Sequence, residues 1–194
     1  ATSEGNIVKF WRVNGNDFSL SVSDGIGGKG LQAAYKKVDD ITDLPKACYQ
    51  GFTIAVSGSD YSDYDDYLVE FETANGDNCG WGSWVEVVAP ETIVDLDAST
   101  MPITLVNTQA NEFELREFDW DNKLAGDNNT NPSPSFVGRP ISDLFFFKNR
   151  LGFISNENII FSESGNYSNF WRTTVTGLLD SAPIDVSVSH TKVA

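Results

Sequence analysis

The sequence has few of the residues on which enzymes and metal proteins most often depend. Its 194 residues include one histidine, two cysteines and one methionine. A Ser-His-Asp arrangement would have to use His190, near the end of the sequence, so a structural role is favoured for this residue. Cys48 and Cys79 match neither a metal-ligand spacing nor a redox pair. No disulfide is inferred, although a single bridge stays open.

Long apolar runs are also absent. No stretch approaches the roughly 20 residues that cross a bilayer, and the first residues lack the basic segment followed by an apolar one that marks a secretory signal. We therefore expect a soluble chain that does not insert into a membrane.

Positive charge is scarce. The 13 Lys and Arg residues face 28 Asp and Glu residues, which gives a formal net charge of −15. Such an excess repels phosphates and argues against tight nucleic-acid binding. Solubility is the simplest role for this charge.

The composition is 40% hydrophobic and 12% aromatic, which supports real cores. We expect a mainly β fold with a little α (α+β). In residues 1–122 the sequence predicts a small β-rich domain. Residues 7–13 and 18–22 flank Asn14-Gly15-Asn16-Asp17, a sequence typical of a hairpin turn. Apolar residues spaced as i, i+3, i+4 and i+7 predict one helix over 31–38.

The other predicted strands of this domain follow from β-branched and aromatic stretches. They cover 52–57, 67–72 and 84–88, and a further hairpin joins 104–106 to 112–118 across Gln109-Ala110-Asn111.

A second lobe is expected after a polar linker at 123–135. Residues 136–194 predict an antiparallel meander, with strands at 144–147, 151–154 and 159–161 and a further strand through Ile184, Val186 and Val188. Such a unit cannot bury its apolar residues alone. We interpret it as an incomplete part of a larger β-propeller-like domain, and the chain as an internal fragment of a longer protein.

One motif suggests nucleotide binding. Gly25-Ile26-Gly27-Gly28-Lys29-Gly30 satisfies G-x-G-x-x-G. The preceding strand alternates with serines, whereas the first strand of a dinucleotide-binding fold is continuously apolar. The P-loop pattern fails because Gly30, not Ser or Thr, follows Lys29. A plain glycine linker is favoured over a nucleotide-dependent enzyme.

Acidic and aromatic clusters suggest two further sites. Asp60, Asp63, Asp65 and Asp66 could bind calcium, as could Asp119 and Asp121, but neither group has the EF-hand spacing. Carboxylate pairs at glycosidase separation cannot be identified from sequence. A sugar-stacking platform is a weaker interpretation than core packing for four tryptophans: Trp81, Trp84, Trp120 and Trp171. We therefore assign no catalytic, cofactor-binding or metal-binding residue.

Residues 131–170 carry the most informative motifs. They read NPSPSFVGRPISDLFFFKNRLGFISNENIIFSESGNYSNF. This stretch resembles the tail tubular protein B (tail nozzle) family of short-tailed phages, or podoviruses, whose members carry TNPxPSFVG, DLFFF-x-NRLGF, ENII-x-S and YFNF. Further motifs echo the family in order: Ser23-Asp24-Gly25, Asp43-Leu44-Pro45, Asp66-Tyr67-Leu68-Val69-Glu70-Phe71, Trp84-Val85-Glu86, Thr100-Met101-Pro102 and Pro183-Ile184-Asp185-Val186. Loop lengths differ, especially over 75–82.

The resemblance implies a structural virion protein without catalytic activity, located in the tail after assembly in the bacterial host cytoplasm. In this family six copies form a nozzle ring below a tail tubular protein A-like adaptor, with tail fibres nearby, and DNA passes through during ejection. An acidic wall would repel DNA and let it slide, the reverse of counterion-release binding. The alternative is a carbohydrate-binding or polysaccharide-depolymerising β-domain of a phage tail.

The scarce cations carry a separate hypothesis. Arg139, Lys148 and Arg150 are expected to pair with carboxylates within the meander or across subunits of a ring.

Overall fold

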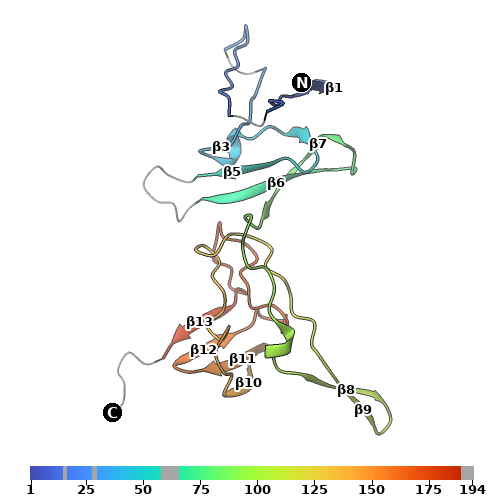
Figure 1. Ribbon diagram of the computed structural model, residues 1–194, viewed down its shortest axis with the longest axis vertical. Coiled ribbons are helices and arrows are strands. Elements are labelled where there is room, and N and C mark those ends of the chain that lie inside the picture. Colours follow the sequence, from blue (N-terminus) through green and yellow to red (C-terminus); the bar gives the residue numbers. More distant parts are fainter. Residues whose placement is uncertain (15–16, 28–29, 58–65, 189–194) are drawn as a thin grey trace. The chain divides into compact units, whose positions relative to one another are not determined.

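The computed structural model describes residues 1–14, 17–27, 30–57 and 66–188. Contacts divide the chain into two compact units, Ala1–Ala89 and Pro90–Ala194. Both are built mainly from strands (Figure 1), which confirms the mainly β prediction.

The first unit contains a short hairpin and a five-stranded sheet. The hairpin pairs β1 (Thr2–Glu4) with β2 (Ile7–Lys9). The sheet has the order β3-β5-β6-β7-β4. Its strands are β3 (Lys37–Val38), β4 (Ala47–Tyr49), β5 (Thr53–Val56), β6 (Tyr67–Thr73) and β7 (Cys79–Val87). The strands expected at 52–57, 67–72 and 84–88 are confirmed as β5, β6 and part of β7.

The core of this unit lies on one face of the sheet. Buried Leu44, Ile54, Val56 and Val69 form a cluster, against which Phe52 and Trp84 pack. Tyr67, Val69 and Phe71 alternate along β6 with polar or less buried neighbours, which is the period of a strand with one buried face.

The first predicted hairpin is wrong. Strand β2 pairs with the strand before it, β1, with Thr2 opposite Lys9, and it does not pair with residues 18–22. Gly5 has a φ of 59°, so the turn forms at this earlier glycine, which accepts a positive φ without steric cost. Gly15 and Asn16 of the expected turn lie outside the described residues.

The helix predicted over 31–38 is also wrong. Lys36 has a φ of 60°, outside the helical region, and Lys37–Val38 forms β3, parallel to β5. Ala34 and Val38 both pack on the core of the sheet. Their spacing therefore reflects a common core contact made by an irregular chain. Helix in the described residues consists of short 3-10 turns such as Ile41–Asp43 and Ala98–Thr100, and none of the described helices has the length and apolar character needed to cross a membrane.

The second unit contains a hairpin and a four-stranded antiparallel sheet. The hairpin joins β8 (Thr104–Gln109) to β9 (Glu112–Arg116). The sheet runs in chain order through β10 (Asp143–Phe147), β11 (Arg150–Ser155), β12 (Asn158–Phe161) and β13 (Ile184–Ser187). The predicted meander, its later strand and the second hairpin are confirmed. Lys148 and Asn149 have φ of 46° and 60°, the conformation of a two-residue hairpin turn that follows the sheet twist.

The aromatic core of the second unit lies on one face of this sheet. Phe136, Phe153, Phe170 and Trp171 are buried there with four aliphatic residues: Leu96, Met101, Leu151 and Ile160. The rings of Phe153 and Phe170 stack with centroids 4.9 Å apart.

The linker expected at 123–135 packs inside the second unit, and the division between the units lies earlier, after Ala89. Asn131 is 2% exposed, and its side-chain amide donates to the carbonyls of Ala125 and Arg172 at 2.9 and 2.8 Å. The polar residues of this stretch thus satisfy buried backbone groups, which composition alone does not distinguish from an exposed loop.

Candidate interaction surfaces

The glycine stretch is organised by its own aspartate. The Asp24 carboxylate accepts hydrogen bonds from the backbone N–H groups of Ile26, Gly30 and Leu31 at 3.1, 2.7 and 3.2 Å. A phosphate-binding loop needs such N–H groups for its anion. Here a carboxylate already occupies them and would repel a phosphate, which supports the linker interpretation. Gly28 and Lys29 lie outside the described residues.

The acidic residues do not gather around an ion site in the part of the chain that is described. Asp60, Asp63 and Asp65 lie outside it, as does His190. Asp121 accepts hydrogen bonds from Asn166 Nδ2 and Ser168 Oγ at 2.7 and 2.8 Å, so it ties two loops together. Among the described residues, no group of three or more His, Cys, Asp or Glu side chains is arranged to hold a metal.

The tryptophans mostly fill cores. Trp84 packs edge-on against Phe71 and donates its indole N–H to the Pro45 carbonyl at 2.9 Å. Trp171 is 1% exposed, and Trp120 packs against the same core. Trp81 is the exception at 71% exposure. The core interpretation is therefore right for three of the four.

The two cysteines lie on paired strands but do not face each other. In the β4–β7 register Cys48 stands opposite Gly80, and Cys79 stands opposite Tyr49. Successive side chains of a strand point to opposite faces, so the two thiols lie on opposite faces of the sheet. Both are free cysteines, and burial raises the pKa of each thiol.

The three expected cations have different environments. Arg150 is 8% exposed, and its guanidinium donates to three backbone carbonyls, those of Ser162 (2.7 Å), Ala182 (2.8 Å) and Asp180 (2.9 Å). The predicted pairing of Arg150 with a carboxylate inside the meander is therefore wrong, because carbonyls from two later loops fill its donor sites. Lys148 lies over the Phe147 ring at 5.4 Å, and Arg139 is exposed. Pairing across subunits stays a prediction.

Sequence reasoning missed a buried lysine. Lys123 is 2% exposed, its Nζ lies 4.6 Å from the Trp171 ring centroid, and it has no hydrogen-bond partner among the described residues. Burial lowers the pKa of Lys123, and the nearby Asp127 acts in the opposite direction. The residues around Lys123, Asn122 before it and Leu124 after it, form no pattern that separates this lysine from a surface one.

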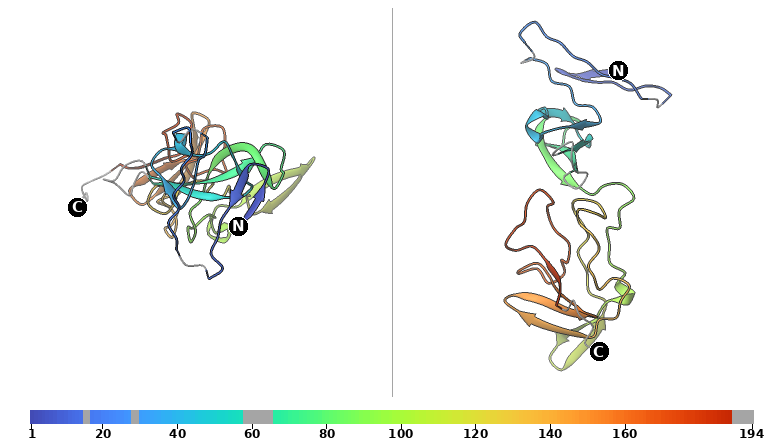
Figure 2. Two further views of the ribbon diagram at one scale, coloured as in Figure 1. Left: turned by 90° about the horizontal axis from the view of Figure 1, so that it is seen from above. Right: turned by 90° about the vertical axis from the view of Figure 1, so that its left-hand side faces the viewer.

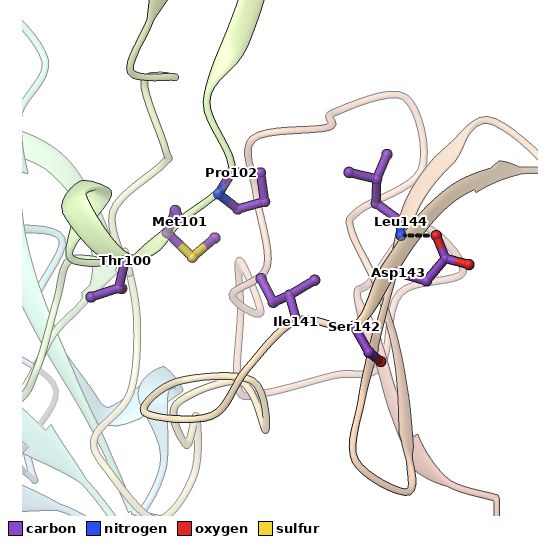
Figure 3. Close-up of a pocket in the computed structure, with 7 residues that line it drawn as sticks. All are labelled: Thr100, Met101, Pro102, Ile141, Ser142, Asp143 and Leu144. Carbon is purple, nitrogen blue, oxygen red and sulfur yellow. Dashed lines mark hydrogen bonds between the residues drawn. The ribbon is translucent and has the colours of Figure 1, made fainter.

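A shallow groove lies between two segments of the second unit (Figure 3). Thr100, Met101 and Pro102 form one wall, and residues 141–144 form the other. The cavity volume is about 440 Å³. A second depression of about 340 Å³ shares Thr100, Met101 and Ile141 with it. We call the first of these the groove.

The four-stranded sheet has a second apolar face. Its register places seven apolar side chains on the side opposite the aromatic core: Phe145, Phe147, Ile154, Ile159, Phe161, Ile184 and Val186. Phe147, Ile184 and Val186 are 55%, 40% and 46% exposed. We call this side the outer sheet face. A sheet that is apolar on both faces is typical of one covered on both.

The β8–β9 hairpin also presents an apolar face. Leu105 stands opposite Leu115, and Phe113 opposite Asn107, so these side chains share one side of the ribbon with Ile103. Ile103, Leu105, Phe113 and Leu115 are 61%, 62%, 61% and 63% exposed. We call this side the hairpin face. Exposed apolar surfaces of this kind mark sites of protein contact.

The described residues therefore define a β-rich module whose prominent surfaces are suited to contact with other protein. The model of the bacteriophage nozzle protein family matches residues 1–194, and the chain belongs to that family. It is thus a component of a phage tail, as the resemblance of residues 131–170 implied.

A curated relative is consistent with this family. The chain is 34% identical to the "Tail tubular protein gp12" of Escherichia phage T7 over 176 residues, which cover 91% of the chain and 21% of the T7 protein. The match therefore spans about a fifth of that relative's length.

Proposed function

We propose that this chain is part of a structural subunit of a phage tail nozzle, a ring through which DNA is ejected into the host, and that it has no enzymatic role. The observation that carries the proposal is the family match over the whole chain. The open apolar faces of the sheet and the hairpin support it, because an assembly subunit needs surfaces that become buried only in the complete particle.

The outer sheet face supports a more specific architecture. In a β-propeller each four-stranded blade packs between neighbouring blades, so both of its faces become buried. The sheet β10–β13 has the antiparallel chain order of such a blade and two apolar faces. We propose that it is one blade, and that other parts of a longer nozzle protein cover its outer face.

The ring is proposed to contain six copies and to contact a tail adaptor protein and tail fibres. A closed ring requires two different surfaces on each subunit, since every copy contacts a neighbour on each side. The net charge of −15 fits a conduit that does not bind DNA specifically, because an acidic wall repels the passing duplex.

Electron microscopy of a full-length nozzle protein carrying this sequence tests the proposal. We expect rings with sixfold symmetry and an open bore. A protein that stays monomeric at all concentrations, with and without the adaptor, would contradict it.

A carbohydrate-binding or depolymerising domain is the alternative. The exposure of Trp81 favours it, because a flat exposed indole can stack on a sugar. The burial of Trp171 and the packing of Trp84 and Trp120 count against a wider platform. Host polysaccharide offered to the chain and to Trp81→Ala separates the two functions: binding lost in the variant supports the alternative, and no binding to either protein supports the nozzle.

A further inference from the structure

Lys123 of the second unit carries a buried amine without an acceptor among the described residues. Its side chain is 2% exposed, and its Nζ has no hydrogen-bond partner in that part of the chain. Buried N–H donors are nearly always paired, either with protein or with ordered water. The Trp171 ring, whose centroid lies 4.6 Å from Nζ, supplies a cation–π contact but no oxygen. The amine therefore needs an acceptor of another kind.

The position of this amine limits what can reach it. Residues 120–131 and 168–172 form two loops of the second unit (Figure 1; right-hand view of Figure 2). The loops lie side by side, since the Trp171 indole N–H donates to the Asp121 carbonyl at 3.0 Å. Lys123 Nζ is buried by the unit itself. Another polypeptide segment cannot contact it unless the loops open, whereas a ligand the size of a water molecule or a single ion fits such an interior site.

Asp127 is a charged group that acts on this amine. Burial lowers the pKa of Lys123, and Asp127 opposes that shift. The pKa of Asp127 is lowered first by the hydrogen bond from the Thr130 N–H, and Lys123 adds to the same shift. The two side chains thus interact electrostatically, although no direct salt bridge joins them in the described part of the chain. Polar groups that interact beyond direct contact are commonly bridged by water.

The Asp127 carboxylate can accept a further hydrogen bond. Its Oδ1 accepts from the Asn129 N–H, the Thr130 N–H and the Thr130 hydroxyl at 2.8, 2.8 and 3.0 Å. These bonds fix the carboxylate at the start of a turn. Its Oδ2 accepts no hydrogen bond from the described residues, and the side chain is half-buried. Oδ2 is therefore available to a bridging molecule.

The ligand between these two groups must both accept and donate a proton. A water molecule accepts from the amine and donates to a carboxylate oxygen. Chloride or another small anion accepts from the amine, but the Asp127 carboxylate repels it, and the repulsion is stronger inside a protein than in water. The chemistry of the two partners favours water.

We propose that a buried water molecule bridges Lys123 Nζ and Asp127 Oδ2, so that the two residues form a water-mediated ion pair inside the second unit. The bridge satisfies the amine and links the turn at 127–130 to the lysine that lies over Trp171. Buried waters of this kind are part of a fold and are costly to remove. The bridge concerns the interior of the unit and does not depend on the proposed ring.

A crystal structure of a full-length nozzle protein carrying this sequence, at a resolution that shows ordered water, tests the bridge. We expect a density peak within hydrogen-bond distance of both Nζ and Oδ2. Lys123→Met should lose this peak, and Lys148→Met, the same change at an exposed lysine, should keep it. Crystals grown with bromide in place of chloride identify an anion by its anomalous signal. A wild-type site without a peak, a bromide signal there, or an amine bonded directly to protein would overturn the proposal.

Unfolding in solution gives a second readout. Asp127→Asn keeps the oxygen that caps the turn but removes the charge. A double-mutant cycle of Lys123→Met with Asp127→Asn should show a coupling of about three- to ten-fold in the unfolding equilibrium constant, and the cycle of Lys148→Met with Asp127→Asn should show none. Additive effects in both cycles would refute the pair.

The choice of salt separates water from an anion in the same assay. A bound anion stabilises the folded state increasingly as its concentration rises above its Kd. We expect chloride and gluconate at equal ionic strength to give the same difference in melting temperature between the wild type and Lys123→Met. Stabilisation by chloride that Lys123→Met lacks would assign the site to an anion and exclude the water bridge.

Discussion

Arg150 provides the sharpest test of how the second unit is held together. Its guanidinium joins β11 to the carbonyls of Ser162, Ala182 and Asp180. Ser162 and Ala182 are 0% and 8% exposed, whereas Asp180 is exposed, so water can replace the arginine only at Asp180. Hydrogen bonds to a charged group contribute about 1.5–3 kcal/mol each. Arg150→Met should therefore lower the free energy of unfolding by about 3–5 kcal/mol.

Urea unfolding followed by tryptophan fluorescence measures this loss, since Trp120 and Trp171 report on the same unit. Arg139→Met makes the same chemical change at an exposed site and should stay within about 0.5 kcal/mol of wild type. Arg150→Lys keeps the charge but loses the planar fork, so its loss should lie between the two. Arg150→Glu should be the least stable variant, because a carboxylate repels the three carbonyls. Equal losses for Arg150→Met and Arg139→Met would refute the reasoning.

Three further predictions concern packing, pH and the glycine loop. A Cβ on Gly152 would lie 2.6 Å from Phe145 Cζ, so Gly152→Ala should cost about 1–3 kcal/mol in thermal or urea unfolding, and Phe145→Leu in the same chain should recover part of it. Full cost in the double variant would show that the clash is not the cause. Because burial lowers the pKa of Lys123, the folded chain releases this proton at a lower pH than the unfolded chain, and stability should rise with pH up to the ordinary value of 10.5. Lys123→Met should remove that rise in unfolding curves taken across the alkaline range, and an unchanged slope would exclude Lys123 as its source. The Gly30 N–H donates a hydrogen bond to the Asp24 carboxylate at 2.7 Å, so Asp24→Ala should accelerate hydrogen exchange of the Gly30 amide. Unchanged exchange would mean that other contacts hold the loop.

The meander was predictable because its signals are local. Apolar runs at 144–147 and 151–154 flank a short polar turn, and Lys148 and Asn149 adopt the backbone angles that a tight hairpin requires. The β8–β9 hairpin follows from the same kind of evidence, since Ala110-Asn111 turns the chain and Asn111 has a φ of 67°.

The failures come from contacts that the local sequence does not contain. Residues 31–38 have helical spacing, but Val38 gains a parallel strand partner in Val56, and the sheet determines its conformation. Gly5 supplied an earlier turn than the one expected. The segment 123–135 has the composition of a loop, yet Asn131 binds a carbonyl 41 residues away and becomes buried.

The candidate surfaces divide in the same way. The family could be predicted from the motifs of residues 131–170. The role of Arg150 could not be predicted, because two of its three acceptors lie at least 30 residues away in sequence. The exposure of the hairpin face depends on how the other elements of the unit pack, and the local sequence does not contain that information.

The two-sided sheet affects how sequence variation in this region should be judged. Ile154 and Ile159 belong to the outer sheet face and are half-buried in the unit by itself, so a polar replacement there should cost less than one in the aromatic core. In an assembled nozzle with that face covered, the same replacements would place a polar group in an interior. Most of their cost would then appear as a lower phage titre and little of it as a lower melting temperature. A screen on the purified unit alone would therefore underestimate how harmful these substitutions are.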